Sequence, residues 1–85
     1  MSPGRVVLVT GASSGIGRAC AEAFLAGGDR VVAAARRTER LADLRARHGD
    51  AVLPLTLDVR DRASVSAALT SLPAEWTPID VLVNN

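Results

Sequence analysis

The order of apolar and polar positions predicts alternating strands and helices. Continuous apolar runs, typical of strands buried on both faces, occupy residues 5–9, 30–35, 52–57 and 79–83. Apolar residues at helical spacing occupy the segments 16–24, 38–48 and 61–72. The first of these helices is expected to present an apolar face formed by Ile16, Ala19, Cys20, Ala23 and Phe24.

Residues at the expected helix ends support these boundaries. Thr38 is suited to cap the start of the second helix, and Gly49 is suited to end it. Asp61 can cap the third helix, which Pro73 stops. We therefore expect three helices, each lying between two strands.

Strands that alternate with single helices pair in parallel through right-handed crossovers. This rule leads to the strand order 3-2-1-4 of a doubly wound, Rossmann-type α/β fold. Pro54 cannot donate a ladder hydrogen bond, so the third strand fits best at an edge of the sheet. The crevice between strands one and four then lies where the strand order reverses, which is the usual ligand position in such sheets.

Composition narrows the class of protein. The 85 residues are 48% hydrophobic with a formal net charge of +1, which argues against disorder and against a nucleic-acid surface. A single cysteine excludes an internal disulfide. No targeting segment or long apolar run is evident, so we expect a cytoplasmic protein without membrane association. Only two residues follow the fourth strand, which suggests the front part of a longer protein.

A glycine-rich stretch joins the first strand to the first helix. Its candidate phosphate-binding residues are Gly11, Ala12, Ser13, Ser14, Gly15, Ile16 and Gly17. Glycines in a strand-to-helix turn leave backbone N–H groups free at the positive end of a helix, which suits a pyrophosphate. The alternative is that the tight turn requires glycine for its own conformation.

Two arginines follow the second strand, where the adenosine ribose of a dinucleotide would lie. An acidic residue there would accept from a ribose 2'-hydroxyl and indicate NAD, whereas Arg36 and Arg37 offer a positive site for a 2'-phosphate. The sequence therefore favours NADP over NAD. The alternative is that both are solvated charges at the start of the second helix.

Further candidates end the third and fourth strands. The Asp58 carboxylate could accept from an adenine amino group while Val59 packs on the ring, or Asp58 could serve a turn or helix cap. Asn84 and Asn85 could contact the cofactor ribose or the neighbouring backbone. His48 has no companion ligand, so we expect no metal site.

Three of these segments, 10–17, 58–59 and 83–85, together resemble the short-chain dehydrogenase/reductase family in order and spacing. The resemblance implies hydride transfer between NADP(H) and a small alcohol or carbonyl substrate, in a homo-oligomer. Segments 36–41, 72–76 and 79–80 are similar to NADP-dependent 3-hydroxy acid dehydrogenases, which oxidise serine and allo-threonine. The family's catalytic Tyr-x-x-x-Lys pair and Ser have no counterpart here, so no catalytic residue is assigned.

The expected role of residues 1–85 is the N-terminal, incomplete part of one NAD(P)-binding Rossmann domain, which supplies the cofactor-binding half of an oxidoreductase. The 85-residue segment alone is expected to be inactive, because it has no tyrosine and no lysine for acid/base catalysis. The alternatives are a non-catalytic dinucleotide-binding module or a non-functional gene fragment.

Overall fold

The computed structural model describes residues 4–13 and 15–84, so Ser14 and Asn85 lie outside the described residues. The regular elements are β1 (Val6–Thr10), α1 (Gly15–Ala26), β2 (Arg30–Ala35), α2 (Ala42–His48), β3 (Val52–Thr56), α3 (Arg62–Thr70) and β4 (Val81–Val83). Three short 3-10 turns lie between them: η1 (Thr38–Leu41), η2 (Gly49–Ala51) and η3 (Ala74–Trp76). The predicted alternation of strands and helices is confirmed.

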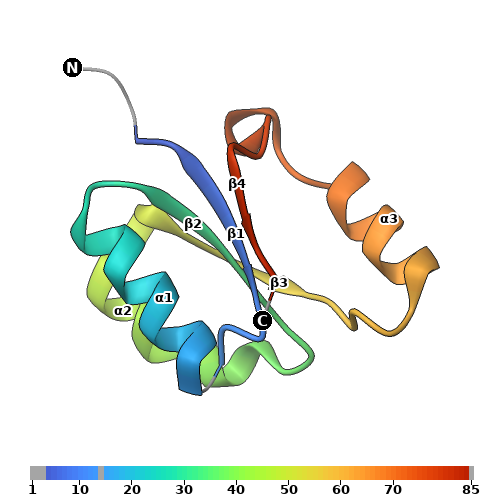
Figure 1. The fold of residues 1–85 in the computed structure, drawn as a ribbon, viewed down its shortest axis with the longest axis horizontal. Coiled ribbons are helices and arrows are strands. Elements are labelled where there is room, and N and C mark those ends of the chain that lie inside the picture. The colour runs from blue at the N-terminus through green and yellow to red at the C-terminus, as the bar shows by residue number, and fades with distance from the viewer. Residues whose placement is uncertain (1–3, 14, 85) are drawn as a thin grey trace.

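The four strands form one parallel sheet in the order β3-β2-β1-β4, as predicted. Val7 of β1 pairs with Val31 of β2 and with Val81 of β4, so β1 has a neighbour on both sides. Pro54 lies in the edge strand β3, opposite Ala33. Helices α1 and α2 cover one face of the sheet and α3 lies over the other (Figure 1). This is the doubly wound, Rossmann-type arrangement.

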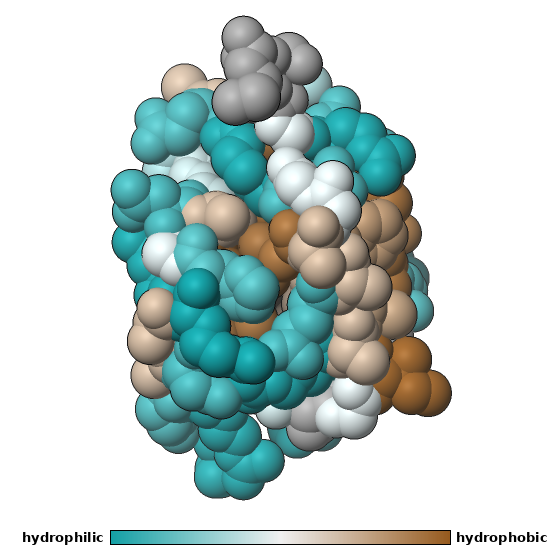
Figure 2. Space-filling view, turned by 90° about the vertical axis from the view of Figure 1, so that its left-hand side faces the viewer, coloured by the Kyte–Doolittle hydropathy of each residue, from teal (hydrophilic) through white to brown (hydrophobic). Residues whose placement is uncertain are grey.

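Both faces of the sheet are packed, but unequally. On the side of α1 and α2, alternate residues of β1 and β2 pack with Ala21, Leu25, Leu41 and Leu44. On the side of α3, the other alternate residues of β1 and β2 pack with Trp76 and with partly buried residues of α3. Helix α3 itself contributes no buried residue. Seen from the side of α1 and α2, hydrophilic side chains cover the left of the view, and more hydrophobic ones occupy its centre and right (Figure 2). None of the described helices is long and apolar enough to cross a membrane.

The buried face of α1 differs from the predicted one. Ile16 is 74% exposed, Ala19 and Ala23 are exposed, and Cys20 and Phe24 are only partly buried. The buried residues are Gly17, Ala21 and Leu25, which follow one another at a spacing of four. Two of these three are among the smallest residues, which let the helix approach the strands closely but contribute little to a hydrophobic pattern. The predicted apolar face was therefore wrong, because the helix is rotated about its axis relative to the orientation expected from the sequence.

The second crossover also differs from the prediction. Thr38 begins η1 instead of capping α2, which starts at Ala42. No side chain caps the start of either element, and Arg37 before η1 is extended. Gly49 ends α2 with a φ of 58°, as its predicted role requires.

The predicted cap of α3 is confirmed. Asp61 accepts hydrogen bonds from the main-chain N–H groups of Ala63 at 3.0 Å and Ser64 at 3.2 Å. These two bonds satisfy donors in the first turn of α3 that have no partner within the helix.

Strand β4 is two residues shorter at its start than predicted, because Asp80 pairs with β1 through its side chain. The Val6 N–H donates to Asp80 Oδ2 at 2.8 Å, and the Asp80 N–H donates to the Val6 carbonyl at 2.8 Å. A carboxylate oxygen thus takes the place of a main-chain carbonyl at this position.

Trp76 anchors the loop before β4. Its side chain is buried, and the Arg30 guanidinium lies over its ring, 5.2 Å from the ring centre. Arg30 Nη1 also donates to the Glu75 carbonyl at 2.8 Å. Both contacts tie this loop to the start of β2.

Replacing Leu44 by alanine should lower the free energy of unfolding by about 2–5 kcal/mol, because the side chain is fully buried between α2 and the sheet. Urea unfolding of the full-length protein measures this loss. Leu69→Ala on α3 is the matched control, since Leu69 is exposed, and it should cost less. Equal losses from the two variants would contradict the packing described here.

Candidate functional site

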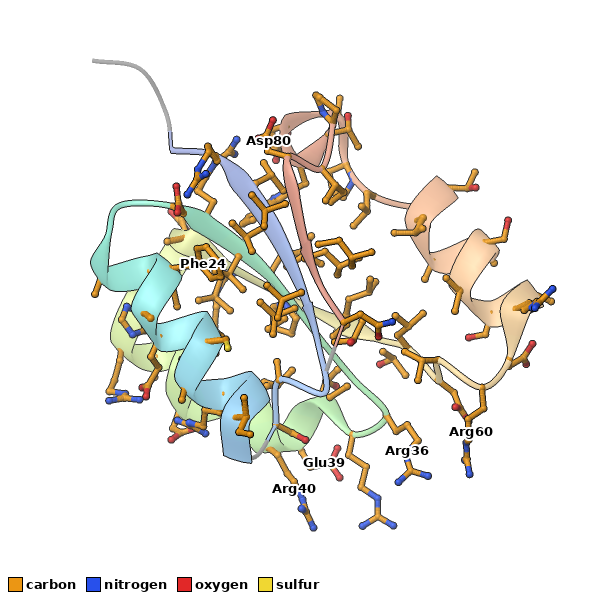
Figure 3. The ribbon with its side chains drawn as sticks, viewed as in Figure 1. Phe24, Arg36, Glu39, Arg40, Arg60 and Asp80 are labelled. Atoms are coloured by element: carbon orange, nitrogen blue, oxygen red, sulfur yellow. The ribbon has the colours of Figure 1, made fainter. Side chains whose placement is uncertain are left out.

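The loops that follow β1, β2 and β3 meet at the carboxyl edge of the sheet and enclose a cleft of about 740 Å³. Its lining residues are Gly11, Ser13, Ala35, Arg36, Arg37, Arg40, Leu57, Asp58, Val59 and Arg60. Arg36, Arg40 and Arg60 extend from this edge of the molecule, whereas Asp80 lies at the opposite edge (Figure 3). The cleft thus brings together six of the predicted site residues from three separate loops.

The glycine-rich turn has the backbone conformation that its glycines allow. Gly11 has a φ of 62° and Gly15 a φ of 59°, values that residues with a side chain rarely adopt. The Ala12 N–H donates to the Ala34 carbonyl at 3.0 Å, which ties the turn to the end of β2. A Cβ atom on Gly15 would meet nothing within 4 Å, so the space above the start of α1 is open.

The remaining predicted residues of this stretch take different positions. Gly17 is buried and Ala12 is fully buried, so they shape the turn and its packing instead of lining the cleft. Ile16 extends from the first turn of α1 into solvent.

The cleft is strongly cationic. Four of its lining residues are arginines, and Asp58 is the single carboxylate among them. Arg36 and Arg37 were predicted from their place after β2, but Arg40 and Arg60 were not. Arg40 lies on η1, three residues after Arg37, and a 3-10 turn brings residues at that spacing onto one side. That spacing is a signal that sequence reasoning could have used.

Asp58 is held by Arg60. Its Oδ1 accepts from the Arg60 main-chain N–H at 3.0 Å and from Nε at 3.1 Å, and its Oδ2 accepts from Nη2 at 3.1 Å. Hydrogen bonds from this guanidinium, then from the main chain, lower the pKa of Asp58 below its ordinary value. The predicted turn role of Asp58 is therefore present. A carboxylate has about four acceptor positions, so one remains for a ligand donor.

Asn84 lies beside the end of β1, outside the lining of the cleft. Its Oδ1 accepts from Thr10 Oγ1 at 3.3 Å, and the same hydroxyl lies 3.4 Å from the Val83 carbonyl. Asn84 thus joins the ends of β1 and β4, at the position where the strand order reverses. Among the residues that the structure describes, no cluster of side chains suits a metal ion.

Comparisons with known proteins agree with the resemblance inferred from the sequence. A family model of short chain dehydrogenases matches residues 5–85. A probable NADP-dependent dehydrogenase of Dichelobacter nodosus is 51% identical over 80 residues, which cover 94% of this chain and 76% of that protein. An NADP-dependent 3-hydroxy acid dehydrogenase of Salmonella typhi is 50% identical over 80 residues, which cover 94% of this chain and 32% of that protein.

A solved structure is also similar. The closed form of serine dehydrogenase complexed with NADP+ superimposes with a TM-score of 0.86 at 47% identity, over 91% of this chain and 31% of that one. This chain therefore spans about a third of the length of two of these three proteins.

Arg60→Gln should raise the pKa of Asp58 toward its ordinary value of about 3.9, because it removes the hydrogen bonds that favour the carboxylate. The folded-state pKa is lowered, so the pair stabilises the fold above about pH 4 and loses this contribution as the pH falls through the folded-state value. NMR titration of the Asp58 carboxyl carbon measures the shift. Arg62→Gln removes an equal charge two residues away as a control; the same shift in both variants would contradict a specific pair.

Proposed function

Because the chain belongs to the short-chain dehydrogenase family, we propose that it supplies the cofactor-binding part of an NADP-dependent oxidoreductase. The observation that carries this proposal is the cationic cleft, in which a glycine-rich turn and the arginines that follow β2 lie at one edge of the sheet. Residues 1–85 would form the N-terminal part of a single Rossmann domain. When bound, NADP(H) would supply the hydride chemistry, and the residues of this chain would hold and orient the cofactor.

The pyrophosphate is assigned to the turn from Gly11 to Gly17. The backbone has positive φ at Gly11 and Gly15, and the 12-residue helix α1 begins at Gly15. The first turn of a helix has unpaired N–H groups and a partial positive charge, both of which favour an anion. The open space above Gly15 leaves room for the phosphate oxygens.

The 2'-phosphate is assigned to Arg36 and Arg37. Both are exposed at the end of β2 and line the cleft. The carboxylate of Asp58 in the same cleft makes its side-chain hydrogen bonds with Arg60, and its electrostatic attraction to Arg36 is weaker. Guanidinium groups bind phosphate with two parallel hydrogen bonds, which a ribose hydroxyl cannot accept in the same way. This charge distribution supports NADP over NAD.

The adenine is assigned to Asp58 and Val59. Asp58 keeps an acceptor position for the adenine amino group, and Val59 presents an exposed apolar side chain at the rim of the cleft. Asn84, bonded to Thr10, is placed to orient the ribose near the end of β1. Roles for Ser14 and Asn85 stay predictions.

The names of the relatives support a proposal for the substrate class. Proteins named as 3-hydroxy acid and serine dehydrogenases are about half identical to this chain, so we propose a small 3-hydroxy acid as the substrate. The 85 residues contain no tyrosine, and all ten basic residues other than histidine are arginine. The acid/base pair of the proposed reaction must therefore come from outside this sequence. A homo-oligomeric state and a cytoplasmic location stay predictions.

Arg36→Asp in the full-length protein should weaken NADPH binding by about 10-fold to 100-fold, because it replaces a positively charged donor by a carboxylate that repels the negative 2'-phosphate. NADH binding should change by much less. Fluorescence titration with both reduced cofactors measures the two dissociation constants. Arg62→Asp, which makes the same change on α3, should leave both nearly unchanged. Equal weakening of NADPH and NADH by Arg36→Asp would refute the 2'-phosphate role.

The purified 85-residue chain should not reduce NADP+ in the presence of L-serine, whereas the full-length protein should, because only the latter would contain the acid/base residues. The absorbance of the reduced nicotinamide follows the reaction. NADP+ reduction by the 85-residue chain would contradict the proposed division of roles. An inactive full-length protein that still binds NADPH would favour a non-catalytic binding module.

A further inference from the structure

Arg18 links the glycine-rich turn, to which the pyrophosphate is assigned, to the segment after β2 that carries Arg36 and Arg37. It lies in the first turn of α1, directly after the glycine-rich turn, and its side chain is 23% exposed. Its Nη2 donates to Asp43 Oδ2 of α2 at 2.5 Å, and its Nη1 donates to the Arg40 carbonyl of η1 at 3.5 Å, a long hydrogen bond. Arg18 does not line the cleft itself.

The segment that Arg18 holds carries three of the four cleft arginines. Between the buried residues Ala35 and Leu41 the chain is mostly exposed, and it contains Arg36, Arg37 and Arg40. Buried Ala35 and Leu41 anchor the two ends of this segment, and the start of η1 has no side-chain cap. The bond to the Arg40 carbonyl acts on the backbone of η1, while the Arg40 side chain lines the cleft.

We propose that Arg18 is a positioning residue for cofactor selectivity, which fixes the spacing between the glycine-rich turn and the arginines of residues 36–41. This inference rests on the proposed NADP-binding function. NADPH carries a pyrophosphate and a 2'-phosphate, which must reach the glycine-rich turn and the arginine segment at the same time. A shift of the arginine segment therefore weakens NADPH binding. NADH lacks the 2'-phosphate and depends much less on that segment.

A direct role of Arg18 as a cofactor ligand makes the opposite forecast for Asp43. If Arg18 bound the phosphate, Asp43 would compete for its guanidinium, and Asp43→Asn would strengthen NADPH binding. If Arg18 instead positions the segment through its pair with Asp43, both Arg18→Gln and Asp43→Asn weaken NADPH binding. A hydrogen bond from the Arg18 guanidinium lowers the pKa of Asp43 below its ordinary value, in agreement with this pair.

The chain offers a matched control pair. Arg47 donates to Glu22 and forms a second ion pair between the same two helices. Glu22 lies four residues after Arg18 and Arg47 four residues after Asp43, one helical turn further from the cleft. Loss of this pair removes an equivalent contact between α1 and α2 without touching η1.

The test measures dissociation constants for NADPH and NADH in the full-length protein. Arg18→Gln and Asp43→Asn should each reduce the preference for NADPH about fivefold, and the double variant should lose no more than the single ones, because both act through one pair. Arg18→Lys should restore part of the preference. Arg47→Gln should leave it unchanged, and thermal unfolding of each variant shows whether the helices stay packed.

Several outcomes would overturn this role. An unchanged NADPH preference in Arg18→Gln refutes it, as does tighter NADPH binding in Asp43→Asn. If Arg18→Gln does not fold, the exposed Asp43→Asn and the conservative Arg18→Lys decide the question. A wild-type protein without any preference for NADPH overturns the proposed function and this inference with it, whereas a wild-type preference that survives Arg18→Gln overturns the inference alone.

Discussion

Strand β1 is paired on both sides, and this double pairing holds the glycine-rich turn that follows it at the carboxyl edge of the sheet. Its residues Val6 to Thr10 are all buried, with β2 on one side and β4 on the other. The crossovers that lead to β2 and to β4 run over different faces of the sheet (Figure 1). The glycine-rich turn after β1 lies beside the loops that follow β2 and β3, and the three together line the cleft. Its position follows from parallel pairing and not from any ligand.

Charge gives the cleft a chemical preference that the backbone alone does not. A helix start and a glycine-rich turn suit many anions, because N–H groups recognise phosphate without regard to what carries it. The arginines after β2 add a second cationic region in the same cleft. The Asp58–Arg60 pair places one carboxylate in the same cleft, hydrogen-bonded to Arg60 and attracted more weakly to Arg36. A helix start and a group of arginines in one cleft suit a ligand with phosphates at two places.

The sequence was sufficient to predict the strand order, the edge position of β3 and the cap of α3, because continuous apolar runs, a proline and an aspartate each have a strong local preference. It was insufficient for the buried face of α1, where Gly17 and Ala21 pack closely but carry a weak hydrophobic signal. It also missed Arg40 and Arg60, whose places in the cleft depend on a short 3-10 turn and on the side chain of Asp58. The start of β4 was mispredicted because a side-chain carboxylate replaces a main-chain acceptor.

The packing of α1 against α2 links stability to selectivity. Both helices follow strands of one parallel sheet, so both begin at the carboxyl edge, and the glycine-rich turn and η1 are therefore neighbours. Ala21, Leu25 and Leu44 pack in one core cluster beneath these two helices. A change in that cluster alters the separation of the helix starts as well as the free energy of unfolding. Contacts at the helix starts, such as Arg18 with Asp43, can then adjust the cleft with little effect on the core, because they lie at the surface and contribute little stability.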